Sequence, residues 1–240
     1  MQLNPTLDPD ALHERFKRHG RISIPKILDK ADAETLCKSI EKEPRRNLVF
    51  FANGRHFDID ATGWRDFDEE KKRTTEEIIH AGAQKGFSYF YENIPIYDRW
   101  KAGSELSVPL KNAVAFLNSE PYLNFVRRVT GFDDIAFADA QATLYGPGHF
   151  LTLHNDAVEG KNRRAAFVVN LTKKWRQDWG GYLNFFDEEG HIEGAFMPTF
   201  NTLNMFAVPA AHSVGLVSPF AGAVRISITG WLRAGVDEDA

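Results

Sequence analysis

Cysteine is almost absent from this sequence of 240 residues, in which Cys37 stands alone. One cysteine excludes an internal disulfide and any zinc site built from several cysteines, so nothing points to an oxidising compartment. Long apolar runs are also missing, because none approaches the roughly 20 residues that a membrane-spanning helix needs. Residues 1–5 lack the basic and apolar regions of a signal peptide. We therefore expect a cytoplasmic protein that does not enter a membrane.

An excess of positive charge is missing as well. The net charge is −4 and the isoelectric point is about 6.1, which gives no general attraction to nucleic acid or to an anionic membrane. The chain has no phosphate-binding loop and no G-x-S-x-G motif, so neither nucleotide hydrolysis nor elbow-type acyl transfer has support. Hydrophobic residues make up 43% and charged residues 26%, which is typical of a globular protein and excludes extensive disorder.

The two parts of the chain differ in their periodicity. Residues 1–130 carry mainly helical signals, with capping residues, first-turn prolines and terminal glycines. Residues 131–233 instead show alternation and short apolar runs separated by turns, which favours a sandwich, jelly roll or barrel. No linker separates the two parts, so we expect a single domain over residues 1–240 in which N-terminal helices support a mainly β core.

These signals predict a specific set of elements. Helices are expected at 9–19, 31–43, 105–118 and 119–129, short strands at 21–25, 48–51 and 86–91, and a solvated helix or loop at 66–72. Strands of the C-terminal core are expected at 135–145, 150–154, 165–171, 182–186, 203–208, 213–217 and 224–231.

The strongest candidate for chemistry is His154-Asn155-Asp156 at the end of a predicted strand. Residues two apart in a strand point to the same face, so the imidazole and the carboxylate are expected to converge. His212, at the start of another predicted strand, supplies a third candidate ligand. Two histidines and one carboxylate form the facial triad of non-haem Fe(II) oxygenases, which leaves metal positions open for a co-substrate and O₂.

The H-x-D pattern is not specific by itself, because His56-Phe57-Asp58 matches it too. The next histidine after that motif is His80, across a charged, helix-like stretch with no strands suited to bring the two together. We therefore interpret His56 and Asp58 as an ordinary polar pair.

Two further side chains fit a site around His154. Alternation in 224–229 places Arg225 on one face with two hydroxyl residues. If this face lines a barrel interior, the guanidinium requires an anion, and a carboxylate fits it with two parallel hydrogen bonds. If the face is exposed to solvent, Arg225 makes only a weak surface pair. Tyr145 precedes the turn Gly146-Pro147-Gly148, which is expected to place it on the strand adjacent to that of His154, beside the metal site, or, alternatively, at the surface at a strand end.

This combination resembles the 2-oxoglutarate/Fe(II)-dependent oxygenases, in particular their prolyl 4-hydroxylase-like branch. The segment 145–156 (YGPGHFLTLHND) is similar to the tyrosine, glycine, aromatic and H-x-D stretch of that branch. Segment 170–186 resembles the oxygen-sensing prolyl hydroxylases, whereas 198–212 and 225–231 (RISITGW) resemble those that modify a ribosomal protein. The resemblance covers roughly residues 131–233 and implies a double-stranded β-helix, or jelly roll, buttressed by helices.

The resemblance also implies roles for individual residues. His154, Asp156 and His212 would bind Fe(II), Arg225 would hold the distal carboxylate of 2-oxoglutarate, and Tyr145 would hydrogen-bond a carboxylate of the same molecule. The cofactors would be Fe(II), 2-oxoglutarate and O₂, with ascorbate as a reductant.

The implied activity is a dioxygenase that hydroxylates a prolyl residue in a protein or peptide and converts 2-oxoglutarate to succinate and CO₂. The same chemistry on a small molecule, such as a free amino acid, is an alternative. A non-oxygenase metal-binding jelly roll, either a cupin-like isomerase or a sensor, is an alternative of a different class. The sequence does not determine the oligomeric state.

Overall fold

The computed structural model describes residues 1–236. Its α-helices are α1 (Pro9–His19), α2 (Lys30–Lys42), α3 (Ala61–Arg65), α4 (Glu69–Ala83), α5 (Ile96–Lys101), α6 (Val108–Leu117) and α7 (Glu120–Thr130). A short 3₁₀ helix, η1, spans Gln177–Trp179. None of the helices in this part of the chain is long and apolar enough to cross a membrane.

The strands pair into one large sheet. They are β1 (Arg21–Pro25), β2 (Asn47–Ala52), β3 (Arg55–Asp60), β4 (Tyr89–Ile94), β5 (Ile135–Ala138), β6 (Gln141–Tyr145), β7 (Phe150–His154), β8 (Arg163–Asn170), β9 (Leu183–Phe186), β10 (Ile192–Phe196), β11 (Thr202–Ala207), β12 (His212–Val214) and β13 (Arg225–Ala234).

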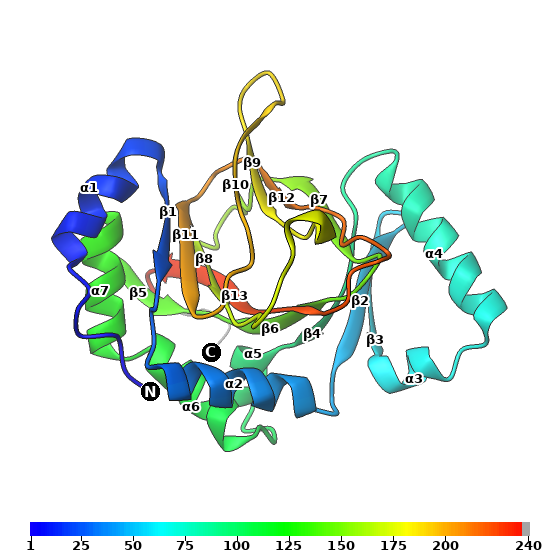
Figure 1. Cartoon of the computed structure of the whole chain (residues 1–240), viewed down its shortest axis with the longest axis horizontal. Helices are drawn as coiled ribbons and strands as arrows, with labels where there is room; N and C mark the ends of the chain where they lie inside the picture. The colour runs from blue at the N-terminus through cyan, green and yellow to red at the C-terminus, as the bar shows by residue number, and fades with distance from the viewer. Residues whose placement is uncertain (237–240) are drawn as a thin grey trace.

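The sheet follows the order β1-β11-β8-β13-β6-β4-β7-β12-β9-β10. Neighbouring strands are antiparallel, as in the β8–β13 and β4–β7 pairs. The sheet curls into a nearly closed, jelly-roll-like barrel (Figure 1), which confirms the expected fold. Strands from the first 130 residues are part of it: β1 pairs with β11, and β4 lies between β6 and β7.

Helices α1, α2, α6 and α7 cover one side of the barrel (Figure 1). Helix α1 begins where the Asp8 side chain accepts hydrogen bonds from the backbone N–H groups of Asp10 and Ala11, and it ends at Gly20 in the left-handed conformation. These helices bury their apolar faces against the outward side chains of the sheet in the largest core cluster, which includes Leu36, Tyr122 and Phe167. The packing leaves the opposite face of the sheet free to line the barrel interior.

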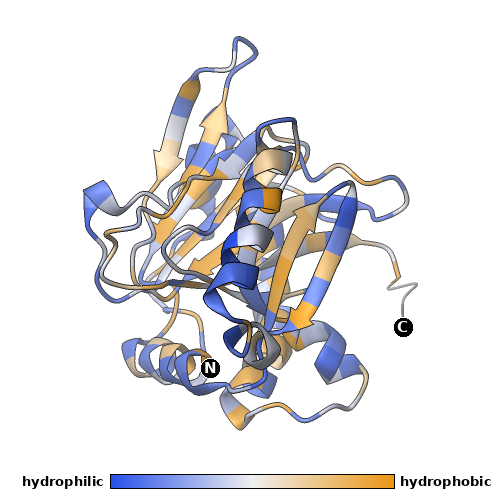
Figure 2. Ribbon diagram, turned by 90° about the vertical axis from the view of Figure 1, so that its right-hand side faces the viewer, coloured by the Kyte–Doolittle hydropathy of each residue, from blue (hydrophilic) through white to orange (hydrophobic). Residues whose placement is uncertain are grey.

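On the other side, α4 packs against β2 and β4 and closes a smaller core around Phe50, Ile79 and Phe90. Figure 2 views the molecule from this side and shows the first half of α4 as hydrophilic and the strands behind it as more hydrophobic. The charged stretch 66–72, expected to be a solvated helix or loop, contains the start of α4. The Asp68 side chain caps this helix by accepting a hydrogen bond from the backbone N–H of Lys71.

The structure divides the expected strand 135–145 into β5 and β6. Both strands pair with β13, and the break lies at Asp139 and Ala140. At this point Gly230 approaches so closely that an added Cβ would lie 1.9 Å from the Asp139 carbonyl oxygen. Strands β3 and β10, like helices α3 and α5, were not predicted. Both strands have mostly exposed side chains, so the alternation of burial that marks a strand is missing there.

Candidate metal centre

Two paired strands bring the candidate histidines together. His154 is the last residue of β7 and His212 the first of β12, and the two are direct partners in the antiparallel ladder. Their ring centroids lie 4.0 Å apart. Residues that are separated by 58 positions in the sequence thus become neighbours through strand register.

Asp156 reaches the histidines by a route that differs from the expected one. Strand β7 ends at His154, so strand alternation does not place Asp156. Its backbone instead turns into the left-handed region, with φ of 62°, a conformation that non-glycine residues rarely adopt. The Asn155 side chain supports this turn by accepting a hydrogen bond from the Ala157 N–H, and Arg163 donates to the Asp156 carbonyl oxygen at 2.9 Å. The convergence therefore depends on a tight turn rather than on a strand.

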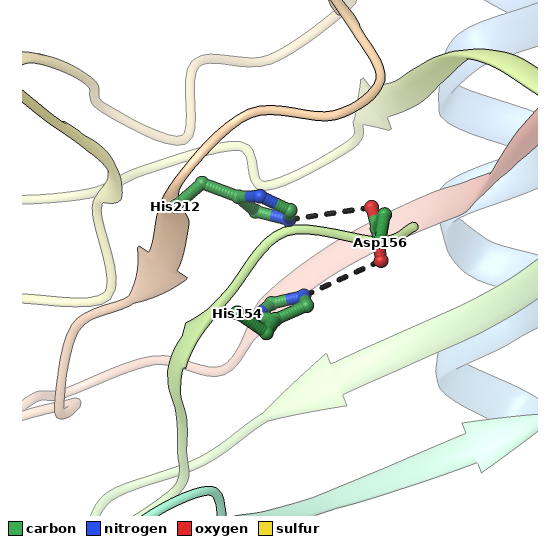
Figure 3. A group of neighbouring side chains, drawn as sticks. All are labelled: His154, Asp156 and His212. Atoms are coloured by element: carbon green, nitrogen blue, oxygen red, sulfur yellow. Dashed lines mark ion pairs between the residues drawn. The ribbon is translucent and has the colours of Figure 1, made fainter. Parts of the chain in front are cut away.

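The three side chains point toward one another, as Figure 3 shows. Nε2 of His154 lies 3.5 Å from Oδ1 of Asp156, and Nε2 of His212 lies 3.4 Å from Oδ2. All three ligand atoms lie within 4.8 Å of one another. In residues 1–236 this is the one group of three or more histidine, cysteine, aspartate or glutamate side chains that could hold a metal ion. No further histidine or glutamate joins it. The metal-binding alternative of the cupin type, with its larger ligand set, is not favoured.

The other ring nitrogens determine what these atoms can bind. Nδ1 of His154 donates to the Thr152 carbonyl oxygen at 2.9 Å, and Nδ1 of His212 donates to the Ala210 carbonyl oxygen at 2.7 Å. Because a carbonyl only accepts, each neutral ring carries its hydrogen on Nδ1 and directs the lone pair of Nε2 at the carboxylate. Three electron-rich atoms that face one point require a cation there, so the donor set fits Fe(II).

The charge states of the ligands agree with this assignment. Burial lowers the pKa of His212 to about 4, so its ring is neutral at neutral pH. Burial opposes ionisation of Asp156, but in the metal-free protein a proton on Nε2 of His154 or His212 favours it and holds the pKa of the carboxyl below its usual value. A neutral imidazole at His212 and an ionised carboxylate at Asp156 are the forms that bind metal.

Arg225 lies in the barrel interior rather than at the surface. It is 2% exposed, and no carboxylate in residues 1–236 forms an ion pair with it. Its Nε has no hydrogen-bond partner, and burial lowers the pKa of the guanidinium, although arginine stays charged. Ser227 and Thr143, hydrogen-bonded to each other at 2.9 Å, lie in the same cavity. A buried, unpaired guanidinium requires an anion, so the site fits a carboxylate of 2-oxoglutarate.

Tyr145 is also buried and lies directly opposite Arg225 in the β6–β13 ladder. The guanidinium carbon of Arg225 lies 5.0 Å from the centre of the Tyr145 ring. Burial raises the pKa of Tyr145 well above its ordinary value, so the phenol remains a hydrogen-bond donor. The surface alternative for Tyr145 is wrong. The expectation that its strand adjoins the strand of His154 is also wrong, because β4 lies between β6 and β7.

All of these side chains line one cavity of about 460 Å³ inside the barrel. Its walls include apolar residues such as Leu151, Val168 and Phe206. His56 and Asp58 lie on the exposed strand β3, outside the ligand cluster, in agreement with their interpretation as polar residues. The ring of His80, on α4, packs against Phe150.

Sequence reasoning missed several residues of the cavity. Phe87, Tyr89 and Tyr91 line it, and their spacing of two in an aromatic run was a signal that they share one face. Arg163 lines it too, with its guanidinium 3.5 Å from the centre of the Trp231 ring. Gly181 lets the chain pass close to Val217 and Trp175, because a Cβ there would lie 3.1 Å from the Val217 side chain and 3.2 Å from the Trp175 ring. Only the folded structure reveals these last two roles.

Comparison with known proteins agrees with this geometry. Residues 140–233 match the model of the 2OG-Fe(II) oxygenase superfamily. The chain is also 30% identical over 130 residues to mouse prolyl 3-hydroxylase OGFOD1, a match that covers 51% of this chain and 23% of the mouse protein. The resemblance that the sequence motifs indicated is thus confirmed.

Solved structures share the fold at low sequence identity. A Pseudomonas putida prolyl-4-hydroxylase has 16% identity and a TM-score of 0.61, with 95% of this chain and all of that chain covered. A Trichoplax adhaerens prolyl hydroxylase, in complex with a hypoxia inducible factor peptide fragment, has 16% identity and a TM-score of 0.60, with 94% and 89% covered. The family match includes His154, Asp156, His212 and Arg225, and this family uses Fe(II), 2-oxoglutarate and O₂.

Proposed function

We propose that this chain, whose residues 140–233 carry the 2OG-Fe(II) oxygenase signature, hydroxylates a prolyl residue in a protein or peptide and converts 2-oxoglutarate to succinate and CO₂. The observation that carries the proposal is one cavity in which the ligand set His154, Asp156 and His212 shares its walls with the unpaired Arg225. The metal held by these ligands binds one end of 2-oxoglutarate, and Arg225 binds the other end.

His154, Asp156 and His212 would hold Fe(II), and three such ligands leave metal positions for a co-substrate and O₂. When bound, iron with 2-oxoglutarate and O₂ supplies the oxidising power for hydroxylation of a C–H bond. The carbonyl groups of Thr152 and Ala210 fix the ring orientation of His154 and His212 through their Nδ1–H groups. The protein thus contributes a preformed site whose geometry does not depend on the flexible ends of long side chains.

Arg225 binds the distal carboxylate of 2-oxoglutarate, and the Tyr145 hydroxyl donates a hydrogen bond to a carboxylate of the same molecule. Both residues are fixed by the β6–β13 ladder, so the co-substrate is oriented before the reaction begins. The apolar walls exclude water from the reacting atoms and limit side reactions.

A prolyl substrate is supported by the mouse relative, which is a prolyl 3-hydroxylase. Aromatic residues at the entrance to the cavity, with Phe87 exposed beside His154, offer a flat apolar surface to a ring-containing substrate. Free amino acids are the small-molecule alternative, and the experiment below separates the two.

The test is an assay of succinate formation with iron-loaded protein, 2-oxoglutarate and a library of proline-containing peptides, with free proline and other amino acids in parallel. Mass spectrometry identifies the oxidised product. Peptide-dependent succinate with hydroxylated proline supports the proposal. Succinate that depends only on a free amino acid would replace the peptidyl substrate by a small molecule, and the variant His154→Ala serves as the inactive control.

A further inference from the structure

The aromatic residues beside the metal centre form a continuous series that ends at the surface. The Tyr145 and Tyr91 rings stack with centroids 4.8 Å apart, and the Tyr91 and Tyr89 rings lie 5.8 Å apart. A second path reaches the same residue from a metal ligand, because Phe87 lies 5.7 Å from His154 and 5.5 Å from Tyr89. Both paths meet at Tyr89, which lines the cavity and contacts the exposed His56.

Tyr89 differs from Tyr91 and Tyr145 because a histidine, which can accept a proton, lies beside its hydroxyl. Its hydroxyl lies 2.5 Å from Nδ1 of His56, which is exposed on β3. Burial and the nearby Asp58 raise the pKa of Tyr89 to about 12, so the phenol is protonated at neutral pH. Loss of an electron from a phenol is favourable only when its proton leaves as well, and a neutral imidazole at hydrogen-bond distance can take that proton. Packing alone would need only a phenylalanine at this position.

We propose that Tyr89 and His56 form a redox-active site that protects the enzyme when oxidant arises at the metal centre without substrate. This inference rests on the proposed function, which supplies the one-electron oxidant. Tyr89 loses one electron, which passes through Tyr91 and Tyr145 to the metal-centred oxidant, and the phenolic O–H bond breaks as its proton moves to Nδ1 of His56. The products are a Tyr89 phenoxyl radical, a His56 imidazolium and a centre reduced by one electron.

The site is restored from solution. An enediol reductant of the ascorbate class returns one hydrogen atom to the Tyr89 oxygen, and the His56 imidazolium releases its proton to water. The exposure of His56 gives solvent access at this end of the series, whereas Tyr145 at the other end is buried. The oxidising equivalent thus moves from the metal centre to a side chain that contacts the exposed His56, before it damages the metal ligands.

The test uses iron-loaded full-length protein, without substrate, in two arms: 2-oxoglutarate with O₂, and hydrogen peroxide without 2-oxoglutarate. Freeze-quench electron paramagnetic resonance, on protein with ring-deuterated tyrosine, detects and assigns a tyrosine radical. Succinate is measured in the first arm, so a failure of the proposed function is seen separately. The second arm supplies the oxidant even if no succinate forms.

The variants Tyr89→Phe and His56→Phe are compared with Tyr182→Phe, whose hydroxyl hydrogen-bonds the Gln177 carbonyl oxygen away from the series. We expect the radical in wild type and Tyr182→Phe, its loss in Tyr89→Phe, and a severalfold lower yield in His56→Phe. We also expect Tyr89→Phe to inactivate after severalfold fewer uncoupled turnovers. Absence of a tyrosine radical from both wild-type arms, or an undiminished radical in Tyr89→Phe, would overturn the inference.

Discussion

At the scale of single residues, the site is defined by side chains whose polar atoms lack a partner of opposite charge. Two Nε2 lone pairs face a carboxylate, and a buried guanidinium faces no anion in the described chain. Each arrangement is unfavourable in the empty protein and favourable when a cation or an anion is bound. These residues therefore lower the stability of the ligand-free protein and raise its affinity for a cation and an anion.

Replacement of Arg225 tests this exchange directly. In Arg225→Met, we expect 2-oxoglutarate to bind at least about 30-fold more weakly, because loss of one member of a buried charge pair costs about 2–5 kcal/mol. Metal affinity is expected to stay the same, and the metal-free variant to be more stable than wild type, because an unpaired buried charge is removed. Calorimetric titration and urea unfolding measure these effects. Unchanged 2-oxoglutarate affinity would place the anion-binding group elsewhere.

Acid sensitivity of the metal-free protein tests the burial of His212. Its folded pKa of about 4 lies below the ordinary value of 6.5, so the folded state takes up fewer protons than the unfolded state between these pH values. The free energy of unfolding is thus highest above pH 6.5 and falls by about 3 kcal/mol as the pH is lowered toward 4. Urea unfolding across this interval measures the fall. His212→Gln is expected to lose most of this dependence, and equal pH dependence in both proteins would refute the explanation.

At the scale of elements, strand pairing brings the residues of the site together. The C-terminal strands and the helices near 9–19 and 119–129 were predictable, because alternation, capping residues and terminal glycines are local signals. The pairing of His154 with His212 was not, since register is decided by partners far away in the sequence. The two H-x-D motifs look alike locally, and only the fold distinguishes them. Likewise, the insertion of β4 between β6 and β7 has no local signal, although it carries Tyr91 to Tyr145.

The loop after η1 gives an element-scale prediction. Gly180 has φ of 67°, and a Cβ there would lie 2.1 Å from the Leu216 carbonyl oxygen. Gly190 has φ of 86° with no atom within 4 Å of such a Cβ, so it is the matched control. We expect Gly190→Ala to cost about 1–2 kcal/mol from backbone conformation. Gly180→Ala is expected to cost at least about 2 kcal/mol more, because the added Cβ clashes with the backbone and because φ of 67° with ψ of −145° lies close to a region that only glycine adopts. Denaturant unfolding compares them, and equal costs would show that the close approach does not constrain the loop.

At the scale of the whole molecule, helices α1, α2, α6 and α7 cover one side of the barrel and α4 covers another (Figure 1). The largest core cluster joins residues of the N-terminal helices with residues of the C-terminal strands, so the supporting helices and the site share one core. Ligands that bind only the folded state raise the free energy of unfolding of the whole molecule, and the rise grows with the logarithm of their concentration over the dissociation constant.

Metal binding should therefore raise global stability. We expect Mn(II), which is bound by similar ligands and is stable in air, to raise the free energy of unfolding by about 2.7 kcal/mol at 100 times its dissociation constant. His154→Ala should abolish this rise, whereas His56→Ala, the same change in the other H-x-D motif, should retain it. A loss of the rise in His56→Ala alone would move the metal site to β3. Thermal unfolding with and without Mn(II) makes the comparison.

We propose that one cavity holds Fe(II) through His154, Asp156 and His212 and 2-oxoglutarate through the metal and Arg225. The most direct measurement is an anaerobic titration of 2-oxoglutarate into the Fe(II)-loaded protein, followed by the metal-to-ligand charge-transfer band that chelation produces. We predict the band in wild type and its absence in Asp156→Ala. A wild-type protein that is folded, holds iron and shows no band would contradict the claim.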